Sequence, residues 1–378
     1  MTQTSPAYVP PSDFAQWEHI APEAAGFNAQ SLDAAIAFAK GHESQWPRSL
    51  YYPDGKYVGL VEWNEKGPWS AIVGPVRERG GPAGLILKGG RIAAEWGDTA
   101  RADMTFSIAK SYLSILAGIA QADGLIPDMD APVGASVPGP YFESAHNAQI
   151  TWRQLLQQSS EWDGTIFEKS DQVDHNRQIG PGADNSRKGE RRELKTPGSF
   201  YEYNDVRVNL LSYCLLSLFR RPLPDVLRER VMDPIGASTG WEWQGYSNSF
   251  VEMDGQRIQS VPGGGHWGGG LFISAQDHAR VGLMAARGGA WGAQQVLSPA
   301  YVAEMTTPSP TLGNYGYLWW LNAGAAHRPH VPADAFFALG AGVNVIWCAP
   351  SLDVVAVLRW IDKSALDAFI DRLMAAVG

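Results

Sequence analysis

A serine and a lysine three residues apart begin the most apolar helical segment of the chain. Ser107 and Lys110 lie in a run from Asp103 to Asp123, and Lys110 is the only charged residue between those two ends. A helix that is apolar on every side is normally buried, and burial disfavours the charged form of a lysine. Side chains at i and i+3 share one helix face, so Lys110 can accept the proton of the Ser107 hydroxyl. The spacing predicts an activated serine nucleophile.

The ends of this helix place the serine where negative charge can be stabilised. We expect Thr105 to be its N-cap and Gly124 to stop it. Ser107 then lies in the first turn, where free backbone N–H groups and the positive end of the helix dipole can stabilise an oxyanion. The alternative is an ordinary polar residue in an early turn, followed by a lysine that extends to solvent. The helix alone leaves both interpretations open.

The elements that must position these residues are strands near both ends of the chain and helices between them. We expect a hairpin over 83–96 that turns at 88–91, and three further strands over 335–339, 343–348 and 353–360. Helices are expected over 28–40, 206–219 and 364–377, and the polar stretch 163–195 is expected to be a long surface loop. Residues 41–81 receive no assignment.

This order of elements predicts an α+β fold with one antiparallel sheet flanked by helices. Because strands come from both ends of the chain, we expect residues 1–104 and 262–378 to form one α/β domain. Residues 105–261 are expected to be a mostly helical inserted domain, with the active site in the cleft between the two.

Composition and charge exclude several other classes of protein. Thirty basic and 39 acidic residues give a net charge of −9, which argues against a nucleic-acid partner. Cys214 and Cys348 lie in apolar runs and are expected to be buried free thiols, and the eight histidines show no metal-ligand spacing. The apolar stretch 210–219 is too short to cross a membrane. Residues 1–13 lack the pattern of a secretory signal, so we expect a cytoplasmic protein.

Several motifs in this order resemble the serine beta-lactamase-related hydrolases. They are the hairpin, Ser107-x-x-Lys110, and the stretches 150–160, 197–205 and 263–277. The family includes class C beta-lactamases, penicillin-binding peptidases, family VIII carboxylesterases and aminohexanoate-oligomer hydrolases. The resemblance runs from about residue 83 to residue 360. It implies the beta-lactamase/penicillin-binding-protein-like fold, with an α/β domain and a mostly helical domain on either side of the active site.

The resemblance also assigns a second catalytic motif. Tyr203-Asn204-Asp205 takes the place of the Tyr-x-Asn of the family. A phenol beside an ammonium loses its proton more readily, so Tyr203 and Lys110 can together serve as the general base for Ser107. Asp205 stands where the family has Asn, and it is interpreted either as a substrate-binding residue or as a cap of the helix from Val206.

The third motif of the family, Lys-Thr-Gly or His-x-Gly, should fall at residues 338–340. Ala338 stands in place of the cation, whereas Gly340 is present and would allow the backbone to approach a substrate closely. The resemblance implies that the residue after this glycine, Ala341, donates its backbone N–H to the oxyanion together with that of Ser107. Without the cation of this motif, and with Asp205 in the second, anionic beta-lactams are expected to bind poorly.

Three further residues are weighed as substrate contacts. His266 and Trp267 belong to the glycine-rich run 263–270, which we expect to form a loop at the floor of the cleft. Trp162 follows a stretch that resembles a cleft-lining segment. Ordinary packing is the alternative for all three. Ser238 lies in a Gly-x-Ser-x-Gly pattern, but a strand should precede such a nucleophile and a helix should follow it, so we reject it.

These interpretations together predict a serine hydrolase that cleaves a small-molecule ester or amide through an acyl-enzyme on Ser107. They predict no cofactor, no metal, and no nucleic-acid or membrane partner. The alternatives are an acyltransferase on the same scaffold, a beta-lactamase or peptidase, and a non-catalytic binding homologue. The natural substrate and the oligomeric state stay open.

Overall fold

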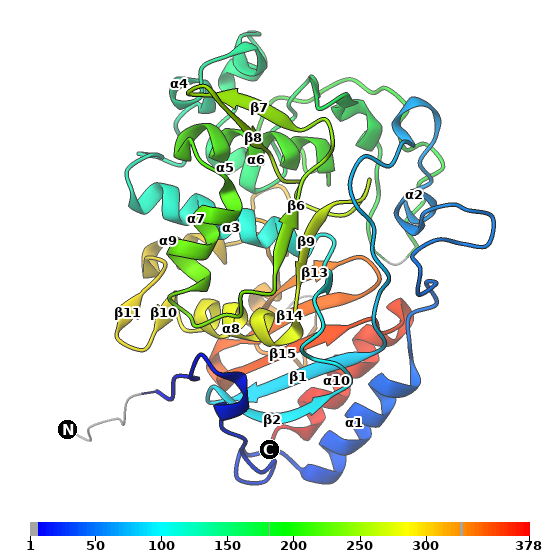
Figure 1. Cartoon of the computed structure of the whole chain (residues 1–378), viewed down its shortest axis with the longest axis vertical. Coiled ribbons are helices and arrows are strands. Elements are labelled where there is room, and N and C mark those ends of the chain that lie inside the picture. The colour runs from blue at the N-terminus through cyan, green and yellow to red at the C-terminus, as the bar shows by residue number, and fades with distance from the viewer. Residues whose placement is uncertain (1–6, 181, 326–327) are drawn as a thin grey trace.

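A six-stranded antiparallel sheet forms the base of the molecule (Figure 1). The computed structural model describes residues 7–180, 182–325 and 328–378, so the first six residues of the polar N-terminal stretch lie outside the described residues. The strand order is β12 (Trp320–Leu321), β13 (Phe336–Gly340), β14 (Asn344–Ala349), β15 (Val354–Arg359), β1 (Ala83–Lys88) and β2 (Arg91–Trp96). Strand β1 pairs with β15, which confirms one sheet built from both ends of the chain.

Helices cover both faces of this sheet. Alternate residues of a strand point to opposite faces, and Leu85 and Leu87 of β1 pack into the larger core with α8 (Ala275–Ala286). Ile86 packs on the other face, against α1 (Ala29–Gly41) and α10 (Leu366–Ala376). Figure 1 shows α1 and α10 side by side under the sheet. These strands and helices lie close to the predicted ranges, and the α+β fold is confirmed.

Helix α3 (Ile108–Ala122) runs through the core above the sheet, with every residue from Ile108 to Ala120 buried. It packs against α6 (Asp205–Phe219), and its apolar faces explain its position. The remaining helices are α2 (Val58–Glu62), α4 (Val133–Ser136), α5 (Trp152–Leu156), α7 (Leu223–Leu227) and α9 (Pro299–Met305), with a π-helical turn at Arg228–Met232. Short 3₁₀ turns include η2 (Gly67–Trp69), η5 (Asp171–Asp174), η8 (Pro350–Leu352) and η9 (Lys363–Ala365).

The expected N-cap of α3 was wrong by two residues. The N-cap is Ser107, and the Thr105 hydroxyl instead lies 2.8 Å from Nε2 of the buried His278. The helix cannot extend back to Thr105, because Phe106 has a positive φ of 49°.

The chain contains more strands than predicted, both within residues 105–261 and just outside them. Strand β9 (Gly270–Ile273) pairs with β3 (Asp103–Met104) on one side and with β6 (Glu242–Gln244) on the other. Strands β7 (Phe250–Met253) and β8 (Gln256–Gln259) form a hairpin that turns at Asp254-Gly255, both at positive φ. Asp-Gly is a strong hairpin signal that the sequence analysis missed. Two further two-stranded pairs are β4 (Thr165–Ile166) with β5 (Lys169–Ser170) and β10 (Ala290–Trp291) with β11 (Gln294–Gln295). The domain boundaries at 104 and 262 stay a prediction.

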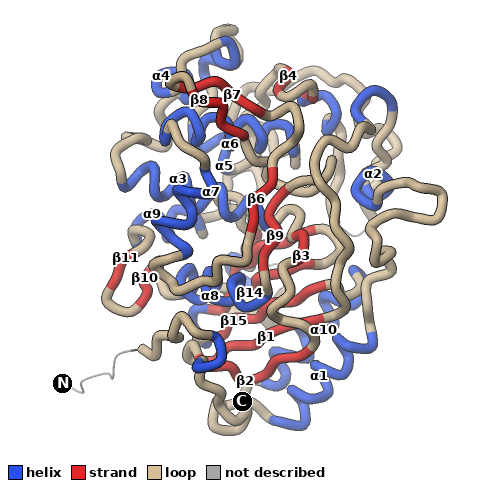
Figure 2. The backbone as a smooth tube through the Cα atoms, viewed as in Figure 1, coloured by secondary structure: helices blue, strands red, loops and turns tan. Residues whose placement is uncertain are grey.

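The stretch 163–195 is not the polar surface loop that we expected. Although it contains little regular structure (Figure 2), its charged residues turn inward. Besides Lys169, which donates to the backbone carbonyls of Trp69 and Ala71, five of its ionisable residues are buried: Asp171, Asp174, His175, Arg177 and Lys188. Each makes an ion pair inside the protein, which is how a folded chain tolerates buried charge. High local charge density therefore did not mean exposure to solvent here.

Two predictions from composition can be compared with the fold. Cys214 and Cys348 are buried free thiols, as expected. Within the described ranges, the longest apolar helices fall short of what a membrane crossing requires.

Candidate active site

Ser107 is presented at the start of α3 by a strained turn. The preceding residue, Phe106, adopts the left-handed region, which is costly for a residue other than glycine. Its ring is held edge-on between Trp46, at 5.3 Å between centroids, and Trp360, at 6.2 Å. This packing fixes the turn, so that Ser107 leaves the buried core and lines a cavity.

Lys110 lies one helical turn further along and is almost fully buried. Its Nζ donates to the Ser107 Oγ at 3.0 Å and to the Gly263 carbonyl at 3.1 Å, and it forms an ion pair with Asp205. Burial acts to lower the pKa of Lys110, but the charges of Asp205 and Tyr203 outweigh it and raise this pKa. The expectation of a lysine neutralised by burial was therefore wrong, because the helix sequence does not contain the counterion.

Tyr203 lines the same cavity as Ser107. Its ring stacks nearly parallel to that of Trp320, with 6.4 Å between centroids. Two cations approach this ring, Lys110 with its Nζ 4.8 Å and Arg177 with its Cζ 5.0 Å from the centroid. Two cations therefore lie beside the phenol that the resemblance assigns to the general base.

The end of β13 packs directly against the backbone of the serine turn. A Cβ atom on Gly340 would lie 2.1 Å from the Thr105 carbonyl oxygen and 3.3 Å from the Ser107 nitrogen, so only glycine fits. The next residue, Ala341, lines the cavity together with Ser107 and Gly340. Among the described residues we find no acceptor for the backbone N–H of Ser107 or of Ala341. Two such amides at one cavity wall can stabilise an oxyanion.

Asp205 lies behind the catalytic groups and does not line the cavity. One carboxylate oxygen pairs with Lys110, and the other accepts from Arg177 at 2.7 Å and contacts His266 Nδ1 at 3.0 Å. Burial acts to raise the pKa of Asp205, but Lys110 and Arg177 hold it well below its usual range. The structure therefore places Asp205 outside the lining of the cavity. It is not the cap of α6 either, because Asn204 Oδ1 accepts from the N–H groups of Val206 and Arg207.

The three further residues weighed as substrate contacts are also buried outside the cavity, whereas Gly340 lines it. His266 is 3% exposed and lies between Asp205 and Glu65, and Trp267 stacks on it at 4.1 Å between centroids. The indole N–H of Trp162 donates to the Tyr141 carbonyl at 2.8 Å. These three positions correspond to the packing alternative weighed above.

The glycine-rich run before β9 does lie under the catalytic groups, as predicted. A Cβ atom on Gly264 would lie 3.3 Å from Lys110 Nζ and 3.6 Å from Ser107 Oγ. Ser238 takes no part in this arrangement. Its hydroxyl donates to Asp277 at 2.7 Å, and it lies in a loop between a π-helical turn and β6. Its rejection as a nucleophile agrees with this position.

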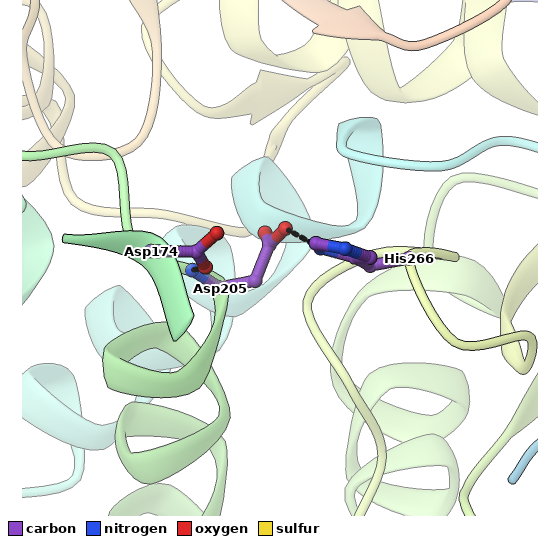
Figure 3. Close-up of side chains that lie close together, drawn as sticks. All are labelled: Asp174, Asp205 and His266. Carbon is purple, nitrogen blue, oxygen red and sulfur yellow. Dashed lines mark hydrogen bonds and ion pairs between the residues drawn. The ribbon is translucent and has the colours of Figure 1, made fainter. Parts of the chain in front are cut away.

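Asp174, Asp205 and His266 meet closely enough to hold a cation (Figure 3). One ligand atom from each lies within 4.8 Å of the others. Protein cations already fill this role, since Arg177 donates to Asp174 at 3.1 Å and to Asp205, while Lys188 lies 3.4 Å from Asp174. We interpret the group as part of an ion-pair cluster and not as a metal centre.

Sequence reasoning missed the charged residues that surround the site. Arg177, Asp174 and Lys188 come from the stretch 163–195, and Glu65 from the unassigned stretch 41–81. Lys188 Nζ pairs with Glu65 at 2.8 Å, which joins these two stretches behind the cavity. No local motif marks them, because their partners are distant in the sequence, apart from the pair that Arg177 makes with Asp174.

The cavity that Ser107 lines has a volume of about 560 Å³. Its walls carry four aromatic side chains, Trp46, Trp63, Tyr203 and Trp320, and aliphatic ones such as Leu339. The charged residues described at its walls are Glu62, Asp362 and Lys363, and Lys363 pairs with Glu62 at 3.0 Å. Among the described lining residues, no unpaired cation is available for an anionic substrate. Ala338 is fully buried and cannot present one, even if substituted, without disturbing the core.

The geometry agrees with comparisons to known proteins. A putative beta-lactamase from Bacteroides dorei DSM 17855 is 17% identical, with a TM-score of 0.57 over 78% of this chain and 93% of its own. A putative 6-aminohexanoate-dimer hydrolase from Bacillus anthracis is 15% identical, with a TM-score of 0.56 over 98% and 89%. EstCE1, a hydrolase with promiscuous acyltransferase activity, is 14% identical, with a TM-score of 0.56 over 92% and 98%.

These solved structures share the fold of this chain. None of the curated protein sequences matches it. The model of the family described as Beta-lactamase matches residues 72–365, which include Ser107, Lys110, Tyr203 and Ala341. The chain therefore belongs to the Beta-lactamase family.

Proposed function

We propose that this protein is a serine hydrolase that cleaves small-molecule esters or amides through an acyl-enzyme on Ser107. The observation that carries the proposal is the Ser107 hydroxyl, 3.0 Å from the Lys110 ammonium, in a cavity shared with Tyr203 and two backbone amides. This arrangement supplies a nucleophile, a base and an oxyanion site. No cofactor is required for the reaction.

The roles follow from the charges at the site. Ser107 Oγ attacks the substrate carbonyl while the Tyr203 phenolate, stabilised by Lys110, takes the serine proton. The N–H groups of Ser107 and Ala341 hold the oxyanion. Tyr203 returns the proton to the leaving group as the carbonyl–leaving-group bond breaks. Water then attacks the acyl-enzyme, with Tyr203 as its base, and regenerates the Ser107 hydroxyl.

Loss of the nucleophile tests this function directly. Ser107→Ala removes one small hydroxyl from the cavity, so the protein should fold normally but lose turnover and covalent labelling by a fluorophosphonate. Intact-mass spectrometry measures the adduct, and Ser238→Ala is the matched control that should still label. If Ser107→Ala protein labels at the wild-type rate, the proposal fails.

The cavity also supports a preference for neutral substrates. Its aromatic walls suit an apolar group. The cation among its described lining residues, Lys363, is already paired with Glu62. We expect kcat/KM for a para-nitrophenyl ester to exceed that for a chromogenic, anionic cephalosporin by at least about a hundredfold. Leu339→Lys places a cation on the wall and should narrow this ratio, whereas the neutral Leu339→Met should not. A wild-type protein that prefers the cephalosporin would contradict the preference.

Acyl transfer is the second candidate function. Its support is the similarity to EstCE1, whose description includes promiscuous acyltransferase activity. An added alcohol or amine would then replace water in attack on the acyl-enzyme. Product analysis with an acyl donor and increasing amounts of such a nucleophile separates the two reactions.

A further inference from the structure

Both ring nitrogens of His266 face carboxylates. Nδ1 lies 3.0 Å from Asp205 Oδ2, and Nε2 lies 2.8 Å from Glu65 Oε2. The Glu65 contact is an ion-pair contact rather than an aligned hydrogen bond. A neutral imidazole has one N–H and would turn a lone pair toward one of the two carboxylates. Because all three side chains are at most 8% exposed, water cannot relieve that repulsion. The geometry fits the doubly protonated imidazolium.

His266 belongs to what we name the buried charge cluster: Glu65, Asp174, Asp205, Lys110, Arg177, Lys188 and His266. Its members are joined by ion pairs from Lys110 and Arg177 to Asp205, and from Lys188 to Glu65 and Asp174. With the imidazolium counted, four positive charges face three carboxylates. The buried charge cluster then carries one excess positive charge.

The anion that can balance this excess is the Tyr203 phenolate. Lys110 and Arg177 lie 4.8 and 5.0 Å from the centre of its ring. Two other groups near His266 leave this count unchanged. The Tyr57 hydroxyl is neutral and donates to the Gly265 carbonyl. Lys169 donates to the carbonyls of Trp69 and Ala71 and has a carboxylate neighbour of its own outside the cluster, Glu168. The same charge balance fails if His266 is neutral, because three cations then match three carboxylates.

We propose that His266 is a positioning residue that stays protonated and, through Asp205, supplies the positive charge that lets Tyr203 release its proton in the free enzyme. The inference rests on the proposed function, since it takes Tyr203 as the base. His266 contacts no substrate in this role. It acts on Asp205, which holds Lys110 against the serine.

The kinetic test is the pH dependence of His266→Gln. Glutamine keeps one N–H for Asp205 but carries no charge. The acid limb of kcat/KM for a para-nitrophenyl ester should move upward by about one pH unit, a roughly tenfold loss on that limb. Activity at high pH should return close to the wild-type level. A uniform loss at every pH, or an unmoved limb, would show a merely structural role and overturn the proposal.

A second variant protects the test against a folding defect. Lys188→Met removes a cation from the same cluster without touching Asp205, and its acid limb should also move upward. The control is Arg187→Met, an exposed neighbour paired with Glu190 outside the cluster, whose limb should stay at the wild-type pH. If the acid limbs of Lys188→Met and Arg187→Met lie at the same pH, the charge argument is wrong.

The protonation of His266 can be measured without any activity. In ¹⁵N NMR of the full chain, the signals absent from His266→Gln identify its ring nitrogens. Both should have imidazolium shifts at pH 7, and a neutral tautomer would overturn the proposal. If the shifts are those of an imidazolium but Ser107 does not label with a fluorophosphonate, the buried charge stands and the proposed function fails.

Discussion

Lys110 shows how one distant carboxylate changes the chemistry of a residue. In an apolar helix alone it would tend to lose its proton, but Asp205 sits against it and raises its pKa. An ammonium cannot accept the serine proton. In the proposed reaction, Lys110 therefore holds Ser107 Oγ by a donated hydrogen bond and stabilises the phenolate of Tyr203, the proposed proton acceptor.

This division of roles predicts non-additive losses. Lys110→Ala and Tyr203→Phe should each lower kcat/KM by several orders of magnitude, since each disables the same proton transfer. The double variant should lose little more than the worse single one, because groups that act as a unit do not contribute independently. Steady-state kinetics with one ester substrate measures all three. Losses that multiply would show that the two residues act in separate steps.

The turn between β3 and α3 positions Ser107, the proposed nucleophile. Phe106 keeps a positive φ because its ring packs edge-on against Trp46 and Trp360. The element therefore combines an unfavourable backbone conformation with favourable aromatic packing, and the packing prevails.

Two substitutions at Phe106 separate these contributions. Phe106→Ala keeps the strained backbone and loses the ring, which should lower the free energy of unfolding by about 3–5 kcal/mol. Phe106→Gly loses the same ring but relieves the strain, so it should be more stable than the alanine variant by about 0.5–1 kcal/mol. Urea unfolding measures both. At an unstrained position the glycine variant would be less stable than the alanine variant. If Phe106→Gly is less stable than Phe106→Ala, the backbone at this position is not strained.

At the scale of the whole molecule, buried ion pairs connect stretches of chain that have little regular structure. Glu161 pairs with Arg192 and Arg207, and Asp174 and Asp205 pair with Arg177. Burial acts to raise the pKa of Glu161, but the hydrogen bond from Arg192 and the charge of Arg207 lower it to about 2. The pKa values of Asp174 and Asp205 are lowered as well.

These shifts predict a loss of stability in acid. A carboxyl group whose pKa is lower in the folded state stabilises the fold above its unfolded pKa, and this stabilisation disappears as the pH falls through the folded pKa. The free energy of unfolding should therefore fall steeply between about pH 4.5 and pH 2. Glu161→Gln should make this fall shallower by up to one bound proton, while the exposed Glu23→Gln should leave it unchanged. An identical slope in Glu161→Gln would contradict the assignment.

The parts of the site that the sequence predicts are the local ones. Ser107 and Lys110 are one turn apart on a helix whose burial follows from its apolar residues, and Tyr203 precedes a second buried helix. The sequence also predicts the strands β13, β14 and β15, because runs of β-branched and aromatic residues alternate there with turn residues. What surrounds the site did not follow, because an ion pair such as Lys188 with Glu65 joins residues far apart in the chain. Nothing near Arg177 in the sequence shows that its charge is buried beneath Tyr203.

The sheet that joins both ends of the chain has a consequence for biosynthesis. Ala83 pairs with Arg359, and Ser107 lines one cavity with its proposed oxyanion partner Ala341, so both contacts need residues that are translated long after β1 and α3. While the ribosome makes the middle of the chain, β1 exposes an unpaired edge and α3 an apolar surface. A nascent or C-terminally truncated chain is then a substrate for chaperones or proteases. The proposed activity can begin only after residues 336–359 have left the ribosome.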